Sequence, residues 1–210
     1  VLAALLNNAD GVAVAGAHGK TTTSAMISCI AVESGVDPTV VIGGEVASLG
    51  GNAINGAGPH VIAEADESDG SFLKFYPHLA VVTNIEDDHL DHYGTEENIY
   101  QAFKQFLGNI REGGKAILCA DNPKLRRLAK ETDKTVLTYG MEGEEADYIA
   151  KNITYGVNGT TYDLYCHGEF VTEVQLIVPG RHNVLNSMGP FAAAREMGLA
   201  VEPILASLEK

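Results

Sequence analysis

The sequence predicts an α/β fold: a mainly parallel sheet flanked by helices, containing a phosphate-binding P-loop, with a small antiparallel β subsheet. Three observations support this prediction. Short apolar runs alternate with helical patterns over the first two thirds of the chain. These runs are almost wholly apolar, which is typical of parallel strands covered on both faces. Residues 146–178 instead alternate apolar and polar side chains, which indicates antiparallel strands.

The elements of the parallel part follow in chain order. Residues Val1–Leu6 are expected to be the last turns of a helix. The expected strands are Val12–Ala15, Thr39–Ile42, Val61–Ala63, Leu79–Thr83, Ala116–Cys119 and Thr135–Thr138. The expected helices are Gly19–Ser34, Glu96–Ile110 and Pro123–Glu131, each with apolar residues at helical spacing. Residues 44–58, rich in Gly and Asn, are expected to lack regular structure, as functional loops often do.

The last third of the chain begins with the subsheet. Its expected strands are Tyr148–Ala150, Thr161–Tyr165 and Glu173–Ile177, with turns at Asn158-Gly159 and His167-Gly168. A helix is expected after Pro179-Gly180, because Val184, Met188 and Phe191 share a face. A final helix is expected at 202–209.

Composition excludes several classes of protein. The chain has 28 acidic and 14 basic residues, a net charge of −14, which argues against nucleic acid as a partner. No apolar run approaches the roughly 20 residues of a membrane span, so no membrane association is expected. Cys29, Cys119 and Cys166 are isolated in apolar segments, which favours reduced core thiols in a cytoplasmic protein. The sequence does not indicate an oligomeric state.

A glycine-rich segment follows the first expected strand and opens the first expected helix. Its candidate phosphate-binding residues are Gly16, Ala17, His18, Gly19, Lys20, Thr21 and Thr22. Backbone N–H groups at such a helix N-terminus bind anions, and here Lys20 would contact phosphate while Thr21 would ligate Mg2+. Gly16 and Gly19 lie closer together than in the common P-loop, so an ordinary glycine-rich turn is the alternative.

Polar side chains follow two further expected strands. Glu64 begins an acidic run, Glu64-Ala65-Asp66-Glu67-Ser68-Asp69, whose carboxylates repel one another unless cations offset them. His89 lies among carboxylates after the next strand, where an imidazole can ligate a metal. Because the carboxyl ends of parallel strands meet at one sheet edge, we expect Glu64 and His89 to share a cation. A solvated acidic loop and a surface histidine are the alternatives.

A third polar motif opens the helix after Pro179-Gly180. Asn183 and Asn186 are three residues apart and share a helix face, where side-chain amides can pair with the edge of an adenine. The alternative for Asn183 is a helix N-cap.

These segments, in this order, resemble the Mur ligase family of ATP-dependent enzymes that add amino acids to peptidoglycan precursors. The P-loop, the His89 motif and Gly180-Arg181-His182-Asn183-Val184-Leu185-Asn186 are similar to family motifs. The acidic run followed by Ser71-Phe72-Leu73, and His18 before Gly19-Lys20, resemble the branch that joins L-alanine to UDP-N-acetylmuramate.

The resemblance implies roles for individual residues. Lys20 would steady the β- and γ-phosphates of ATP, Thr21 would ligate a first Mg2+, and Glu64 and His89 would hold a second. Lys20, Glu64 and His89 are thus the candidate catalytic residues, and Thr21, Glu64 and His89 the candidate metal ligands. His182, Asn183 and Asn186 would bind adenine. Several branches also carry a carbamylated lysine after the His motif, which Lys104 could match, although the L-alanine branch generally lacks it.

The resemblance also implies a domain organisation and a reaction. Residues 1–210 correspond to a central ATP-binding domain, with residues 146–178 as its subsheet, and we expect the UDP-sugar domain and the C-terminal domain to lie outside them. The reaction would form an amide through an acyl phosphate, from UDP-N-acetylmuramate, L-alanine and ATP. The alternatives are the sister branch that recycles murein tripeptide, a P-loop kinase for a small metabolite, and a nucleotide-dependent switch module.

Overall fold

The structure is a computed structural model that describes residues 1–143 and 145–210. One ten-stranded sheet runs through it in the order β10-β9-β8-β7-β6-β5-β1-β4-β2-β3. The strands are β1 (Asp10–Ala15), β2 (Thr39–Val46), β3 (Gly51–Ile54), β4 (His60–Glu64), β5 (Leu79–Val82), β6 (Lys115–Cys119), β7 (Thr135–Met141), β8 (Tyr148–Gly156), β9 (Gly159–Cys166) and β10 (Glu169–Leu176). All neighbouring pairs from β8 through β2 are parallel, whereas the strands at both ends pair antiparallel.

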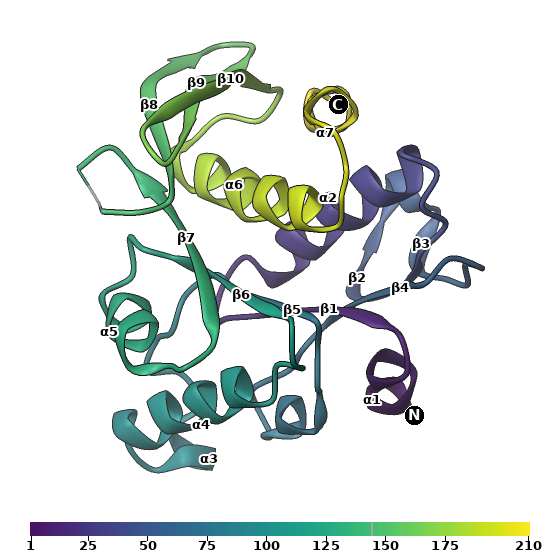
Figure 1. Cartoon of the computed structure of the whole chain (residues 1–210), viewed down its shortest axis with the longest axis vertical. Coiled ribbons are helices and arrows are strands. Elements are labelled where there is room, and N and C mark those ends of the chain that lie inside the picture. Colours follow the sequence, from purple (N-terminus) through teal and green to yellow (C-terminus); the bar gives the residue numbers. More distant parts are fainter. Residues whose placement is uncertain (144) are drawn as a thin grey trace.

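Helices cover both faces of the parallel part (Figure 1). The helices are α1 (Leu2–Asn7), α2 (Lys20–Glu33), α3 (Leu90–Tyr93), α4 (Glu96–Gly108), α5 (Pro123–Glu131), α6 (Arg181–Glu196) and α7 (Val201–Leu208), with 3₁₀ turns η1 (Ala47–Leu49) and η2 (Ser71–Lys74). One face carries α2, α6 and α7, and the other carries α3, α4 and α5. No helix in the described part of the chain is both long and apolar enough to span a membrane.

Local sequence explains where these elements begin and why they are buried. In β1 the five residues from Gly11 to Ala15 are buried, as expected for a strand covered on both faces. Helix α4 begins after Thr95, whose hydroxyl accepts a hydrogen bond from the Asn98 amide at 3.1 Å. The Asn122 side chain caps α5 in the same way, with Pro123 at the first helical position. The expected strands and helices are all present, with shifted boundaries.

The antiparallel subsheet is confirmed, and it is continuous with the main sheet. Strand β8 joins it through a short parallel pairing with β7, from Tyr139 opposite Tyr148 to Met141 opposite Ala150. The turn between β9 and β10 lies at His167-Gly168, as predicted. The turn between β8 and β9 is formed by Val157-Asn158, one residue before the predicted Asn158-Gly159, because Gly159 already pairs with Gly156 as the first residue of β9.

The expectation of an irregular loop over residues 44–58 is wrong in part. Strand β2 continues to Val46, and after η1 the chain returns as β3, antiparallel to β2. Gly50 and Gly51 have φ angles of 76° and 147°, which allow the sharp reversal. The Gly and Asn content therefore reflects a hairpin at the edge of the sheet.

The three cysteines have free thiols but differ in burial. Cys119 is buried as expected, whereas Cys29 and Cys166 are only partly buried. Cys29 lies on α2 with its sulphur 3.2 Å from the Ser48 hydroxyl, and Cys166 ends β9. The expectation of core thiols is therefore correct for Cys119 and too strong for the other two, because an apolar segment does not bury every residue in it.

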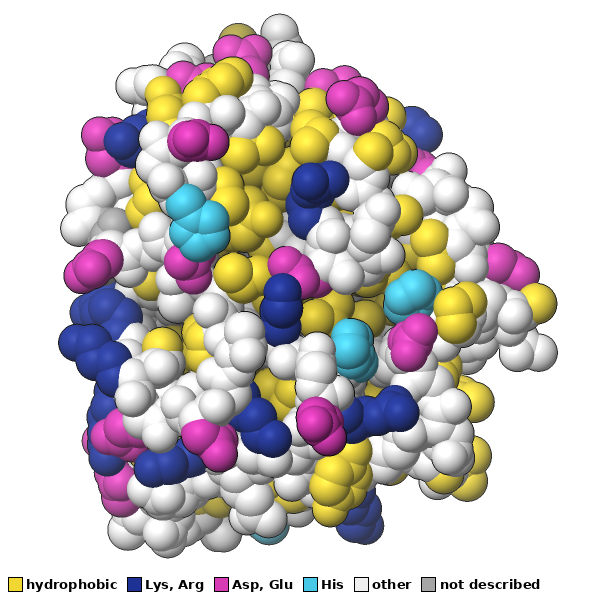
Figure 2. Space-filling model, in the orientation of Figure 1, with side chains coloured by type: hydrophobic (Ala, Val, Ile, Leu, Met, Phe, Trp, Pro, Cys, Tyr) yellow, Lys and Arg dark blue, Asp and Glu magenta, His cyan; other side chains and the backbone are white. Residues whose placement is uncertain are grey.

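Charged side chains of both signs share the surface (Figure 2). Lys and Arg side chains gather along the left edge of that view, where α5 lies, and acidic side chains lie among them. Arg127 of α5, for example, is 3.2 Å from Glu97 of α4 and 2.9 Å from Glu131. Arg127 thus forms ion pairs within the domain.

Candidate functional site

Three loops meet at the carboxyl edge of the sheet. They follow β1, β4 and β5, and β1 lies between the other two strands. The loop after β1 is the P-loop, the loop after β4 carries the acidic run, and the loop after β5 carries His89. Open α/β sheets bind ligands at this edge, because loops from neighbouring strands converge there.

The P-loop backbone is held by the residues that follow β5. The Asn84 side chain accepts a hydrogen bond from the His18 amide and donates one to the His18 carbonyl, both at 2.9 Å. The Thr83 hydroxyl also donates to that carbonyl, at 2.6 Å. The loop is therefore ordered by the protein itself.

Two glycines are required by this close packing. At Gly16, with φ 136°, a Cβ atom would lie 2.0 Å from the Thr83 hydroxyl. At Gly19, with φ 82°, it would lie 2.8 Å from Oδ1 of Asn186. The second contact brings Asn186 of α6 to the P-loop, although 167 residues separate it from Gly19.

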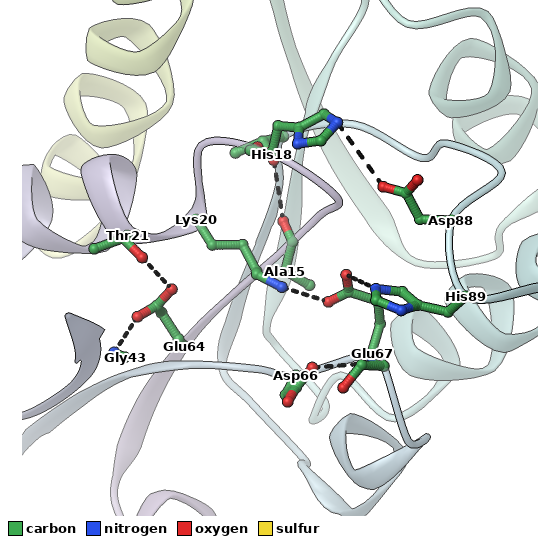
Figure 3. A network of polar contacts seen from close by, with 12 residues as sticks. Ala15, His18, Lys20, Thr21, Gly43, Glu64, Asp66, Glu67, Asp88 and His89 are labelled. Atoms are coloured by element: carbon green, nitrogen blue, oxygen red, sulfur yellow. Dashed lines mark hydrogen bonds and ion pairs between the residues drawn. The ribbon is translucent and has the colours of Figure 1, made fainter. Parts of the chain in front are cut away.

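Lys20 extends toward the acidic loop (Figure 3). Its Nζ donates to Oε2 of Glu67 at 2.7 Å, and the two side chains are 21% and 4% exposed. The other oxygen of Glu67, Oε1, lies 3.6 Å from Nε2 of His89. Sequence reasoning named Lys20 and His89 but did not single out Glu67, which lies between them.

Glu64 faces a different part of the site. Its Oε1 accepts a hydrogen bond from the Thr21 hydroxyl at 2.9 Å, and its Oε2 accepts one from the Gly43 amide. Adjacent ligands of an octahedral Mg2+ with bonds near 2.0–2.1 Å are about 2.9 Å apart, so Thr21 and Glu64 fit one such ion. Within the described residues, the structure records no direct contact between Glu64 and His89, and their shared cation stays a prediction.

The acidic loop is positioned by its own apolar residue and by a tyrosine. Phe72 is fully buried, with its ring centroid 5.2 Å from that of Phe103 and 5.0 Å from that of Phe106, both on α4. The Tyr93 hydroxyl donates to the Glu67 carbonyl. Burial, followed by the charges of Glu67, Asp69 and Asp66, raises the pKa of Tyr93 to about 12, so it remains a donor at neutral pH.

Asp66 is ionised in spite of its acidic neighbours. Burial raises the pKa of its carboxyl, but hydrogen bonds from Ser68 and the positive charge of Lys20 outweigh this and lower the pKa below its ordinary value. Asp66 therefore keeps its negative charge beside the P-loop, where it can attract cations.

The remaining predicted residues lie at the rim. His18 Nε2 is 2.9 Å from Glu86 and 3.8 Å from Asp88, in an exposed group whose atoms could converge on a metal. Asn183 donates to the Pro179 carbonyl at 2.8 Å. The His182 ring packs over Gly180, where a Cβ would meet it at 3.0 Å. The recorded contacts of His182 and Asn183 are thus local, whereas Asn186 reaches the P-loop.

Lys104 lies in another cluster. Its Nζ is 3.3 Å from Glu131, which also accepts a hydrogen bond from the Tyr100 hydroxyl at 2.8 Å. These contacts join α4 to α5 on the face away from α2. The recorded partners of Lys104 therefore include no residue of the three loops.

Two cavities adjoin the site. One, of about 280 Å³, is lined by Lys20, Glu64 and Asp66 together with Gly43 and Leu2, and it is open to solvent. A larger one, of about 510 Å³, lies between α2, the chain after β2 and α7, with Thr21, Thr22 and Cys29 in its wall. The smaller cavity faces the charged groups, and a phosphate or carboxylate could approach them there.

Sequence reasoning missed Glu67, Gly43, Thr83, Asn84 and Tyr93 as parts of the site. Glu67 belongs to the acidic run, and Thr83-Asn84 follows directly after β5, which is a signal that could have found them. Gly43 and Tyr93 had no such signal, because their contacts with Glu64 and Glu67 depend on how the loops fold.

Comparison with known proteins agrees with this geometry. A family model described as the Mur ligase middle domain matches residues 14–194. The UDP-N-acetylmuramate–L-alanine ligase of Pelotomaculum thermopropionicum is 49% identical over 209 residues, which cover 100% of this chain and 45% of the relative. The enzyme of the same name from Desulforamulus reducens is 47% identical over 210 residues, covering 100% and 46%.

Solved structures show the same fold. The UDP-N-acetylmuramate-alanine ligase of Thermotoga maritima matches with a TM-score of 0.85 at 30% identity, covering 97% of this chain and 45% of that chain. The UDP-N-acetylmuramate:L-alanyl-gamma-D-glutamyl-meso-diaminopimelate ligase of Neisseria meningitides matches with a TM-score of 0.86 at 25% identity, covering 98% and 67%. This chain spans less than half the length of the curated relatives it matches. It belongs to the Mur ligase family, and residues 14–194 are its middle domain.

Proposed function

We propose that this chain is the ATP-binding domain of a cytoplasmic ligase that joins L-alanine to UDP-N-acetylmuramate in peptidoglycan precursor synthesis. The observation that carries the proposal is the convergence of Lys20, Thr21 and Glu64 at the carboxyl edge of the sheet. The names of the relatives at 47–49% identity supply the substrates.

Each predicted residue has a role in this proposal. The P-loop residues Gly16, Ala17, His18, Gly19 and Thr22 surround the phosphates, and Lys20 contacts the β- and γ-phosphates. Thr21 would ligate one Mg2+, which Glu64 is close enough to contact as well, and Glu64 and His89 would hold a second. His182, Asn183 and Asn186 bind the adenine. Mg2+ neutralises the charge that the transferred phosphoryl group carries.

The reaction has two steps. A carboxylate oxygen of UDP-N-acetylmuramate attacks the γ-phosphorus of ATP, the bond to the β-phosphate oxygen breaks, and ADP leaves. The L-alanine nitrogen then attacks the acyl carbon, phosphate leaves, and the nitrogen loses a proton as the amide forms. Lys20 holds the phosphates in line for the first step, which depends mainly on positioning and charge neutralisation.

The sites for the sugar nucleotide and for L-alanine are proposed to lie mostly in the parts of the relatives that this chain does not span. We therefore expect the 210-residue chain to bind nucleotide and not to form the amide by itself. Proximity supplies roughly 7–11 kcal/mol of such a barrier, and it requires both reactants to be held.

A calorimetric titration with a non-hydrolysable ATP analogue tests the nucleotide site. Lys20→Ala and Lys20→Arg should each weaken binding of the analogue by at least about tenfold. Lys20→Ala removes the charge-assisted hydrogen bond to the phosphates, and Lys20→Arg moves the positive charge away from its position. Lys20→Arg keeps a positive charge beside Glu67 and so protects the fold. Lys130→Ala, an exposed lysine on α5, is the matched control. Equal affinity in all four proteins would refute the assignment.

A phosphate-release assay on the full-length enzyme that contains this chain separates the alternatives. Release from ATP and UDP-N-acetylmuramate that requires L-alanine supports the proposal. A requirement for murein tripeptide instead would identify the recycling ligase, whose fold is equally similar at TM-score 0.86. Phosphorylation of a small metabolite without an amine would identify a kinase. Hydrolysis that needs no acceptor would indicate a switch module.

A further inference from the structure

Glu67 is a buried carboxylate with an incomplete set of partners. Its side chain is 4% exposed, and its Oε2 accepts a hydrogen bond from Lys20 at 2.7 Å. Its Oε1 is buried and has no hydrogen-bond partner among the described residues. A buried charged oxygen without a partner is costly, so in native proteins it usually marks a place where a ligand or ion binds.

A cation-binding side chain, His89, lies beside that oxygen. Its Nε2 lies 3.6 Å from Oε1, and its side chain is 38% exposed. The backbone of His89 has φ 61°, a left-handed conformation that is uncommon for residues other than glycine and occurs often at functional sites. An imidazole nitrogen and a carboxylate oxygen at this separation need only a small movement to ligate one divalent ion.

Hydrogen bonds to the backbone carbonyl of Glu67 fix the position of this residue. The Tyr93 hydroxyl and the Gly70 amide both donate to the Glu67 carbonyl, the second at 3.2 Å. Phe72 anchors the following turn in the aromatic core. The carboxylate therefore has little freedom to turn toward water, and its two oxygens face Lys20 and His89 in a defined way.

We propose that Glu67 couples the phosphate site to a cation site: Oε2 positions Lys20, and Oε1 ligates, together with His89, a divalent cation. This inference rests on the proposed function, because it assumes that Lys20 contacts nucleotide phosphate. It adds to that function a residue that touches both sites.

Because Glu67 is buried, nucleotide binding and cation binding should strengthen each other. When a nucleotide phosphate draws Lys20 away, the Glu67 carboxylate loses the positive charge that lies 2.7 Å from its Oε2, and a buried carboxylate then favours another cation. A divalent ion at His89 supplies that charge, so nucleotide should strengthen cation binding at His89. By linkage, the cation should strengthen nucleotide binding by the same factor.

Manganese titration followed by pulsed EPR tests the proposal on the 210-residue chain. Coupling of Mn2+ to an imidazole nitrogen reports the site at His89, and His89→Asn identifies that signal by removing it. Glu67→Gln should weaken the Mn2+ affinity of this site by about tenfold or more. It should also abolish the increase in affinity that a non-hydrolysable ATP analogue produces in the unmodified protein.

Asp69→Asn is the matched control, because Asp69 belongs to the same loop, is exposed, and receives its hydrogen bond from the Ser71 amide. Its Mn2+ affinity should remain within about twofold of the unmodified protein. Glu67→Asp keeps the charge and shortens the side chain, so it should recover part of the affinity if Glu67→Gln folds poorly.

The outcomes distinguish this inference from the proposed function. Equal Mn2+ affinity at the His89 site in Glu67→Gln and Asp69→Asn would overturn the role of Glu67, even if nucleotide binds normally. Absence of nucleotide binding in the unmodified protein would refute the proposed function and the coupling. The comparison of the two variants without nucleotide would still decide whether Glu67 ligates the ion.

Discussion

Two clusters of charged residues in this domain look alike in composition and differ in how fully their groups are paired. The loop cluster consists of Lys20, Glu67, His89 and Tyr93, and the helix cluster consists of Glu97, Tyr100, Lys104, Arg127 and Glu131. Each contains a lysine, a carboxylate and a tyrosine. In the helix cluster Glu131 accepts hydrogen bonds from three side chains, and its own side chain is 35% exposed. In the loop cluster Glu67 is 4% exposed and one of its oxygens has no hydrogen bond.

The difference shows how a site that binds ligands can be separated from one that only stabilises the fold. Water and several donors satisfy Glu131, so no further ligand is needed there. Burial and a missing partner leave Glu67 dependent on whatever cation is near. The resemblance to a lysine-containing motif drew attention to Lys104, yet its described contacts are those of a surface ion pair between two helices.

The largest effect should come from removing the cation of the loop cluster. Lys20→Met leaves the Glu67 carboxylate buried without a close positive charge, and it should lower the free energy of unfolding by about 3–5 kcal/mol. The double variant Lys20→Met, Glu67→Gln should recover most of this loss. Urea denaturation at neutral pH measures both. Equal stability of the single and double variants would show that the pair is not energetically coupled.

A smaller effect is expected at the tyrosine of the same cluster. Tyr93→Phe removes the hydrogen bond to the Glu67 carbonyl and should cost about 1 kcal/mol. It should also weaken Mn2+ binding at His89, because the acidic loop loses one of its fixed points. Tyr76→Phe, an exposed tyrosine near the same loop, serves as the control. The expectation fails if both variants melt at the temperature of the unmodified protein.

The stability that the helix cluster contributes should depend on pH. Hydrogen bonds from Tyr100 and Arg127 lower the pKa of Glu131 from 4.5 to about 2. Because the native pKa is the lower one, the stabilisation is complete above pH 4.5 and is lost as the pH falls toward 2. The difference in melting temperature between the unmodified protein and Glu131→Gln should therefore be constant from pH 7 to 5 and shrink by pH 3. A difference that grows on acidification would contradict this.

The smallest effect should come from the lysine of the helix cluster. Lys104→Met removes one partly exposed ion pair of a carboxylate that keeps two other donors, so the free energy of unfolding should change by less than about 1 kcal/mol. The same substitution at Lys20 is expected to cost several times more, and the pair of measurements compares the two clusters directly. A large loss at Lys104 would remove the distinction drawn between them.

Most of the fold could be predicted because it follows from local patterns. Continuous apolar runs such as Leu79–Val82 indicate strands covered on both faces, and Asn158-Gly159 indicates a hairpin turn. The β2–β3 hairpin was not predicted, because its glycines and asparagines have little β-propensity and its pairing depends on the edge of the sheet.

Less of the candidate site could be predicted. Sequence order places the loops after β1, β4 and β5 at one edge, so Lys20 and Glu64 could be assigned to it. Which carboxylate contacts Lys20 depends on the turn that Gly70 and Phe72 impose, and four acidic residues in six positions offer no basis for choosing. The contact between Gly19 and Asn186 depends on how α6 packs against α2, a tertiary feature that spacing does not encode.

The bonds that Thr83 and Asn84 make to the His18 backbone have a consequence for association with ligands. A flexible loop that becomes ordered on binding loses about 1–2 kcal/mol of backbone entropy for each residue fixed. Here the loop after β1 is already in one conformation, so that loss occurs when the chain folds. The same few hydrogen bonds thus contribute to thermal stability and to ligand affinity. Variants that lose the hydrogen bonds of Thr83 and Asn84 at the end of β5 should therefore lose thermal stability and ligand affinity together.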